Sequence, residues 1–210
     1  LTIDYEDESV EVSSIPVDPD TDGIVLPIQW IETVPGIPVM LGDHAATAML
    51  DTARTGPPFM GAALAAPRVI GLVDAGSTRD AFGEEFSTSI GVLVTDIQIG
   101  PFVFERPIVD VAGAEGPWEE DKLNLGESML KYFSTSLDYP NARVQLRPHG
   151  ADGFVPATPY WTTGVTLDYQ GNSMFVSHFV PGTPGSTSGL EIGDQIVELD
   201  GETANGFCAR

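Results

Sequence analysis

Glycine and proline interrupt this sequence so often that short strands and turns are favoured over long helices. The 210 residues include 23 glycines and 17 prolines, which divide the apolar residues into short runs. Such frequent turn formers are typical of β architecture. Hydrophobic residues make up 42% of the chain, which is enough to build a core. The sequence therefore predicts a mainly β globular protein.

The charge of the chain excludes several classes of partner. Nine Lys and Arg residues stand against 31 Asp and Glu residues, so the formal net charge is −22. A chain this acidic repels the phosphates of nucleic acids and of anionic lipids, so neither is expected as a partner. No apolar run approaches the roughly 18 residues of a membrane-spanning helix, so no transmembrane segment is expected.

The sequence also argues against a metal site. Cys208 is the only cysteine, which excludes an intrachain disulfide and a multi-cysteine zinc site. His44, His149 and His178 lie far apart and form no HExxH pattern. The first residues lack the basic and then apolar pattern of a signal peptide. The compartment therefore stays open, with a periplasmic or secreted location as the favoured hypothesis.

Composition divides the chain into four parts. Residues 1–23 carry eight acidic residues and no basic one, which indicates a solvated strand and loop or, alternatively, an inhibitory or docking tail. Residues 24–150 alternate short apolar runs with turn signals and form the first expected domain. Residues 151–161 lack any periodicity and form the expected linker, and residues 162–210 return to short strands.

Two short stretches place an aspartate at a turn directly after an apolar pair. These are Asp51-Thr52-Ala53 and Asp74-Ala75-Gly76. Two such carboxylates that face each other share one proton, because adjacent like charges do not both ionise, so one acts as base and the other as acid. An isolated Asp-Thr pair is usually only a turn or a helix cap, so the surrounding sequence has to decide.

The surroundings of Asp51 resemble those of the retropepsin-like aspartic peptidases. Residues 39–52 give a strand, a Gly42-Asp43 turn and a second strand that runs directly into the aspartate. Residues 123–133 then match the apolar-apolar-Gly run that opens a helix, and residues 137–148 match the final hairpin. The resemblance covers about residues 24–148 and implies a closed β-barrel domain.

The resemblance implies an aspartic endopeptidase that hydrolyses protein or peptide substrates without a cofactor or metal. Asp51 is the catalytic candidate over Asp74, because no hairpin precedes Asp74. One chain supplies one such aspartate, so the resemblance implies a homodimer in which Thr52 hydrogen-bonds across the two-fold axis. The glycine-rich segment 75–88, with Gly76 and Gly83, is the candidate flap over the substrate. The alternative for this segment is an ordinary exposed loop.

Two residues depart from the family pattern. Ala53 stands where the family has glycine, whose missing Cβ allows close approach of two backbones. Arg54 places a cation beside the catalytic turn, where it is expected to lower the pKa of the aspartates. The alternative function is therefore a catalytically weak or inactive pepsin-like dimer that acts as a peptide-binding or envelope assembly protein.

The C-terminal part resembles bacterial PDZ domains. The resemblance rests on residues 176–184, with a Val-Pro-Gly-Thr-Pro run, and on residues 188–201, with Ser-Gly-Leu followed by Gly-Asp-Gln-Ile. Gly164, Val165 and Thr166 then form the candidate strand to which a peptide adds as a further strand. The alternative is a purely structural strand. The pattern predicts a partial PDZ-like module, because a full domain has a further helix and strand after residue 201.

Overall fold

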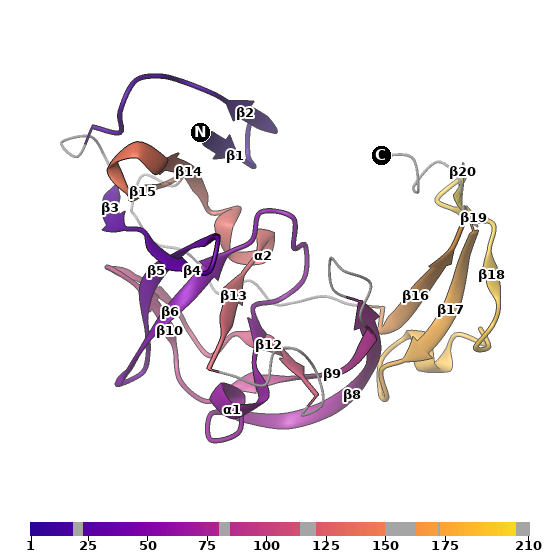
Figure 1. Cartoon of the computed structure of the whole chain (residues 1–210). Helices are drawn as coiled ribbons and strands as arrows, with labels where there is room; N and C mark the ends of the chain where they lie inside the picture. The colour runs from indigo at the N-terminus through magenta and orange to yellow at the C-terminus, as the bar shows by residue number, and fades with distance from the viewer. Residues whose placement is uncertain (19–22, 80–84, 114–120, 150–162, 172, 205–210) are drawn as a thin grey trace.

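The computed structural model describes residues 1–18, 23–79, 85–113, 121–149, 163–171 and 173–204. Nearly all of the regular structure in these ranges is β-strand (Figure 1). The helices among the described residues are single turns: α1 (Ala62–Ala65), α2 (Glu127–Leu130), and the 3₁₀ turns η1 (Tyr139–Asn141) and η2 (Gly185–Thr187). The predicted mainly β fold is confirmed.

The first sheet is antiparallel and contains both the N-terminal strands and the final hairpin of the large domain. Its order is β2 (Ser9–Glu11), β1 (Thr2–Asp4), β14 (Phe133–Asp138), β15 (Arg143–Pro148) and β3 (Ile24–Pro27). The amino group of Leu1 donates a hydrogen bond of 3.0 Å to the carbonyl of Leu137 and fixes the start of the chain on β14. The acidic N-terminal segment therefore forms strands, as the strand-and-loop interpretation predicted.

The second sheet is strongly curled and carries the candidate site. It runs β11 (Phe102–Phe104), β10 (Ile97–Ile99), β5 (Val34–Leu41), β6 (His44–Leu50), β13 (Leu123–Leu125), β7 (Phe59–Met60), β12 (Ile108–Ala112), β9 (Glu85–Leu93) and β8 (Val69–Arg79), and β4 (Gln29–Ile31) pairs with β5. The predicted hairpin before Asp51 is present. Gly42 turns it with a φ of 61°, a conformation that glycine adopts at little cost.

Strand β13 is inserted between two strands that lie far away in the sequence. It pairs in parallel with β6 and antiparallel with β7, and all three of its residues are buried. Its burial explains the apolar Leu123 and Leu125, because a strand enclosed on both sides has no face toward water. This insertion brings residues 123–126 against the turn that follows β6.

The core lies between the two sheets of the large domain. Alternate residues of β5 point inward, and Ile37, Val39 and Leu41 are all at most 3% exposed. Phe133 from the first sheet is fully buried, and its ring centroid lies 4.9 Å from that of Phe102 in the second sheet. This aromatic contact joins the sheets.

The C-terminal module has a small sheet of its own. It contains β16 (Val165–Gln170), β17 (Ser173–Phe179) and β18 (Gln195–Ile196), followed by the hairpin of β19 (Glu198–Leu199) and β20 (Glu202–Thr203). Within the described ranges β16 is an edge strand and pairs only with β17. The β8–β9 hairpin extends from the large domain toward β16 and β17 (Figure 1).

We predict that Phe133→Ala lowers the free energy of unfolding by about 3–5 kcal/mol, because it leaves a cavity between the two sheets. The matched control is Val103→Ala, which truncates a side chain that is 37% exposed in β11, next to Phe102. It is expected to change stability by less than about 1 kcal/mol. Urea denaturation of both variants checks the difference. Equal losses would contradict the assigned role of Phe133.

Candidate active site

The turn after β6 positions Asp51 through backbone contacts to β13. The backbone N–H of Asp51 donates to the carbonyl of Leu125 at 3.0 Å, and the N–H of Arg54 donates back to the carbonyl of Asp51 at 3.2 Å. The first bond continues the β6–β13 pairing by one residue, and the second closes a tight turn. Asp51 therefore sits at the end of a buried strand pair, on a rigid base.

Two donors hold the carboxylate of Asp51. The backbone N–H of Ala53 donates to Oδ1 at 3.1 Å, and the side-chain amide Nδ2 of Asn124 donates to Oδ2 at 2.9 Å. Asn124 is only 4% exposed, so its bond is shielded from water. One oxygen is thus oriented by the turn itself and the other by strand β13.

Sequence reasoning missed Asn124. The sequence feature that could have identified it is a single polar residue between two leucines, in the run Leu123-Asn124-Leu125. The two leucines predict a buried strand, which the structure contains as β13. A buried amide needs polar partners, so its presence there pointed to a nearby polar group. Its Oδ1 is buried and has no hydrogen-bond partner among the described residues.

Gly126 makes the close approach of the two turns possible. A Cβ atom at this position would lie 2.4 Å from the carbonyl oxygen of Arg54, which is closer than real contacts allow. That same oxygen accepts a hydrogen bond of 2.7 Å from the N–H of Glu127, the first residue of α2. The apolar-apolar-Gly run of the sequence therefore packs directly on the Asp51 turn.

Arg54 is paired with a different carboxylate than the sequence suggested. Its guanidinium forms an ion pair with Asp110 of β12, donates from Nε to the carbonyl of Pro57 at 2.9 Å, and lies 4.8 Å from the ring centre of Phe59. The expected influence of this cation on the catalytic aspartates was an inference from sequence proximity. In the structure, the charge of the Arg54 guanidinium is paired with Asp110.

The N-terminal segment reaches the same turn. The hydroxyl of Tyr5, between β1 and β2, donates to the carbonyl of Thr52 at 3.2 Å. Burial raises the pKa of Tyr5, and the charges of Glu127 and Asp51 add to this. His149 lies 3.0 Å from Glu6 and anchors the same segment. The acidic segment thus contacts the Asp51 turn through the Thr52 carbonyl.

The structure places the remaining predicted site residues at the Asp51 turn, in the β8–β9 hairpin and at the start of β16. Thr52 and Ala53 lie beside Asp51 and are exposed. Asp74 lies in strand β8, in the hairpin, and its side chain is 68% exposed. The structure therefore does not bring Asp74 to the Asp51 turn, because β8 and β6 are separated by four strands of the second sheet.

The candidate flap forms a hairpin whose strands are β8 and β9. Gly76 lies in β8 at a bulge, because the register of the pair shifts between Asp74 and Gly76. Gly76 has a φ of 88°, which favours glycine. Gly83 lies outside the described residues.

The candidate peptide-binding strand begins at a constrained glycine. Gly164 has a φ of 71°, and a Cβ there would lie 1.9 Å from Oγ1 of Thr183. Its carbonyl accepts a hydrogen bond of 2.8 Å from the N–H of Val180. Val165 and Thr166 continue from it as the first residues of the edge strand β16, with half-buried side chains.

Comparisons with known proteins give one family match and a structural similarity. Residues 144–208 match the model of the PDZ domain family, which confirms the resemblance of the C-terminal part. The match begins inside β15, a strand that pairs with β14 and β3 of the large domain. The chain is also similar to the crystal structure of a retropepsin-like aspartic protease from Rickettsia conorii, with 17% identity and a TM-score of 0.45. That similarity covers 60% of this chain and 98% of the other. No curated protein matches the sequence.

No group of three or more His, Cys, Asp or Glu side chains is placed to hold a metal ion in the part of the chain that the structure describes. Likewise, none of the described helices has the length and apolar character needed to cross a membrane.

We predict that Asp110 makes stability fall as the pH rises from about 4 to about 6. Burial raises the pKa of Asp110 from 3.8 to about 6, although Arg54 opposes this. The folded state therefore holds the proton more tightly than the unfolded state, and ionisation costs folding free energy. The difference of about two pKa units corresponds to about 3 kcal/mol of folding free energy. This contribution is fully present below about pH 4 and is lost as the pH rises through about 6.

The measurement is the free energy of unfolding from pH 3.5 to 7 for the wild type and Asp110→Asn. The wild type is expected to lose stability relative to the variant across this window. Asp43→Asn, at the exposed turn of the β5–β6 hairpin, is the control and removes a carboxylate from the surface. A constant difference between the wild type and Asp110→Asn would refute the assignment.

Proposed function

We propose that this protein is an aspartic endopeptidase in which the Asp51 carboxylates of two identical subunits activate a water molecule. The observation that carries the proposal is the double restraint on Asp51, from the Ala53 N–H and the Asn124 amide. A carboxylate that only caps a turn needs no second donor from a distant buried strand. Fixing both oxygens is what a general acid or base needs to meet its proton in one geometry.

The proposed reaction uses the pair as one base and one acid. Two facing carboxylates share a single proton, because like charges at close range do not both ionise. The ionised Asp51 takes a proton from water as the oxygen attacks the peptide carbonyl carbon, while the protonated Asp51 donates to the carbonyl oxygen. In the tetrahedral intermediate, the Asp51 that took the proton from water now gives it to the leaving nitrogen, while the other Asp51 takes a proton from a hydroxyl of the intermediate. The C–N bond breaks, and a carboxylic acid and an amine are released.

A surface that remains open in the single chain supports the homodimer. Thr52 and Ala53 are exposed at the catalytic turn, although the strands on either side of the turn are buried. The N-terminal segment, whose Tyr5 donates to the Thr52 carbonyl, also exposes apolar side chains. Val10 in the edge strand β2, and Val12 and Ile15 just after it, are 68%, 85% and 81% exposed. Apolar side chains beside an unpaired strand edge are a surface that a second chain can cover.

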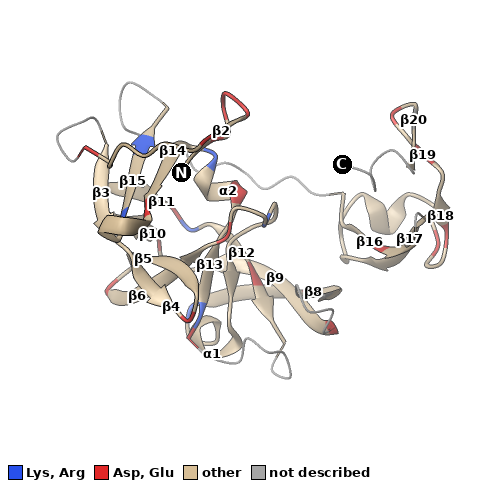
Figure 2. Cartoon of the chain, turned by 45° about the horizontal axis from the view of Figure 1, so that its top comes forward, with Lys and Arg blue, Asp and Glu red and all other residues tan. Residues whose placement is uncertain are grey.

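The charge of the molecule limits its substrates. The PDZ-like part, residues 163–204, contains six acidic residues and no Lys or Arg, as the absence of blue on β16–β20 shows (Figure 2). An acidic peptide is repelled by this part and by the chain as a whole. We therefore expect protein or peptide substrates that are neutral or basic around the segment that binds.

A second candidate function is peptide binding without turnover. The PDZ match favours it, because such domains add a peptide to an edge strand, and β16 is an edge strand. Ala53 in place of glycine is the feature of the large domain that fits the same alternative. The two functions differ in whether the protein cleaves peptides and whether that cleavage needs Asp51. The next experiment measures both.

We predict that Asp51→Asn abolishes cleavage of a random peptide library, because it removes the ionisable group from both halves of the pair. Asp74→Asn is the matched control, since it makes the same change at the other aspartate turn. It is expected to retain most of the activity. Mass spectrometry of the library after incubation at several pH values detects the products. Cleavage by Asp51→Asn would contradict the mechanism, and a wild type without cleavage would favour the binding function.

We predict that Asn124→Ala lowers kcat by about 10- to 100-fold, the loss expected when an oriented hydrogen bond of about 1.5–3 kcal/mol to a charged group disappears. Asn141→Ala is the control, because Asn141 donates in the same way to Asp138, at 3.0 and 2.9 Å, in the β14–β15 turn. Both variants are expected to lose stability, but only Asn124→Ala is expected to lose turnover. Equal kcat values in the two variants would show that Asn124 acts only on stability.

A further inference from the structure

We propose that the PDZ-like module is an autoinhibitory element that holds the β8–β9 hairpin and places strand β16 in the path of the substrate. The inference rests on the proposed peptidase function for its effect on cleavage. Its structural part, the docking of the module on the hairpin, stands independently.

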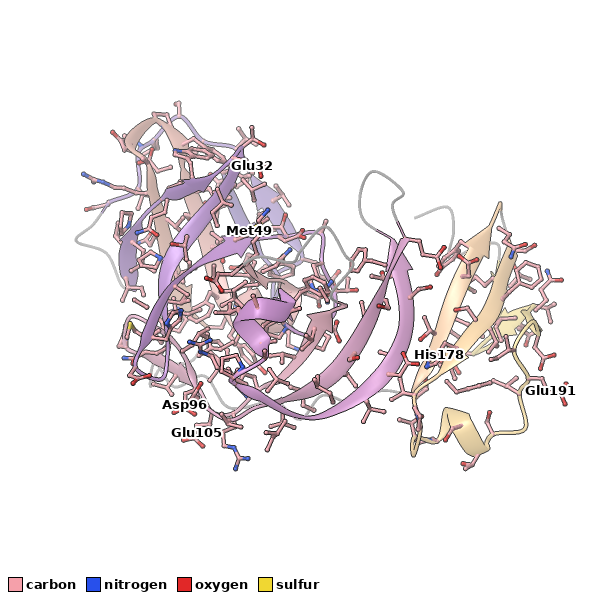
Figure 3. The ribbon with its side chains drawn as sticks, turned by 60° about the horizontal axis from the view of Figure 1, so that its bottom comes forward. Glu32, Met49, Asp96, Glu105, His178 and Glu191 are labelled. Atoms are coloured by element: carbon pink, nitrogen blue, oxygen red, sulfur yellow. The ribbon has the colours of Figure 1, made fainter. Side chains whose placement is uncertain are left out.

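Two polar contacts connect the module to the hairpin. Oγ1 of Thr166 in β16 donates to the carbonyl of Ala75 in β8 at 3.0 Å, and Nε2 of His178 in β17 lies 3.3 Å from the carbonyl oxygen of Asp74. The same Nε2 lies 3.9 Å from the Asp74 carboxylate. Figure 3 shows His178 on β17, directed toward the β8 side of the hairpin.

Local irregularities on both strands shape this contact. The register of β8 against β9 shifts between Asp74 and Gly76, which leaves Ala75 in a bulge whose carbonyl accepts from Thr166. The register of β16 against β17 shifts directly after Thr166. Bulges redirect strands and their polar groups, and here two of them meet at one contact.

Gly76 allows the two parts to approach closely. A Cβ at Gly76 would lie 2.7 Å from the Cβ of His178, so any side chain at this position would push the module away. Its positive φ gives a second, independent reason for glycine. The candidate flap glycine of the sequence therefore lies at the docking contact.

A cavity beneath the contact explains how docking inhibits. It has a volume of about 750 Å³, and strand β16 lines it from Gly164 to Tyr169. The hairpin lines another side, with Ser77 and Thr88. The large domain contributes Thr55, four residues after Asp51, and Asp110, the ion-pair partner of Arg54. Strand β16 thus forms one wall of a cavity whose opposite wall includes Thr55, just after the Asp51 turn.

Two consequences follow for a substrate. An extended peptide that passes along the Asp51 turn toward Thr55 meets β16 in the cavity, so the module has to move before the substrate binds fully. The hairpin, tied to the module at Ala75 and Asp74, is kept from closing over the peptide. Release of the docking contact removes both obstacles together.

The first test is a cross-link that reads the geometry without using activity. Gly76→Cys with His178→Cys, in a chain that also carries Cys208→Ser, places the two Cβ atoms 2.7 Å apart in the docked arrangement. A displacement of about 1–2 Å brings them to the roughly 3.5–4.5 Å that a disulfide requires, so the bond forms only while the module stays next to the hairpin. Oxidation is expected to give an intramolecular disulfide in most molecules. The matched control is Gly71→Cys with His178→Cys, because Gly71 lies in the same strand with nothing near its Cβ position. Equal yields from both pairs would overturn the docking.

The second test measures the effect of docking on cleavage. Oxidised Gly76→Cys/His178→Cys is expected to cleave the peptide library at least about 5-fold more slowly than the reduced form, and Thr166→Val/His178→Ala about 5-fold faster than the wild type. Gln195→Ala, which removes a bond within β17–β18 and touches no residue of β8, is the control and is expected to leave the rate unchanged. A faster locked form or a slower undocked form would overturn autoinhibition.

Hydrogen exchange separates this proposal from the proposed function. The amides of residues 69–79 are expected to exchange faster in Thr166→Val/His178→Ala than in the wild type, with or without any peptidase activity. Unchanged exchange would overturn the docking even in an active enzyme. Faster exchange together with an absence of cleavage in every variant would overturn both the peptidase function and the autoinhibition. It would still support the docking of the PDZ-like module on the β8–β9 hairpin.

Discussion

The insertion of β13 between β6 and β7 is the constraint on which the candidate site depends. Through it, the three residues of β13 supply the carbonyl that fixes the Asp51 backbone and the Asn124 amide that holds the carboxylate. Gly126, which directly follows the strand, packs on Arg54. Each of these contacts needs the same register of β13 on β6. A shift by one residue would turn Asn124 to the opposite face and replace it with leucine. Burial of Leu123 and Leu125 therefore fixes the register of β13 on β6, and this register places the Asn124 amide against the Asp51 carboxylate.

Local sequence signals predicted the fold because they agreed with one another. The Gly42-Asp43 turn, the apolar alternation of Ile37 and Val39, and the break at Pro67 after α1 each gave an element that the structure contains. The preference for Asp51 over Asp74 came from the hairpin that precedes it, and the structure places Asp74 away from that turn. The acidic N-terminal segment also forms strands, because β1 pairs with β14 and β2 pairs with β1.

The sequence could not reveal the contacts made between distant segments. Asn124 and Asp51 are 73 residues apart, and Arg54 and Asp110 are 56 apart. Proximity along the chain suggested that Arg54 acts on Asp51, whereas the fold offers its guanidinium a nearer carboxylate on β12. The docking of His178 on Asp74 joins two modules across 104 residues. Such pairings depend on strand order and on how modules meet, and neither follows from local periodicity.

The large domain and the PDZ-like part are both rich in acidic residues and meet at the β8–β9 hairpin. In the proposed function, the PDZ-like part lies against the β8–β9 hairpin, so whatever displaces this part also opens the proposed path of the substrate. The proposed mechanism also requires a second subunit, because one chain holds only half of the proposed carboxylate pair and its Asp51 turn is exposed. Activity in this account requires both a partner subunit and release of the module.

The most direct measurement of the shared site is a mixing experiment between active and inactive subunits. A fixed amount of wild-type chain is incubated with a ninefold excess of Asp51→Asn, long enough for subunits to exchange, and cleavage of the peptide library is then measured. If two Asp51 residues form one site, most wild-type chains enter mixed dimers, and activity falls to about one-tenth of that of the wild type alone. Activity that remains unchanged in the presence of the variant would show that each chain works alone, and would contradict the paired-carboxylate mechanism.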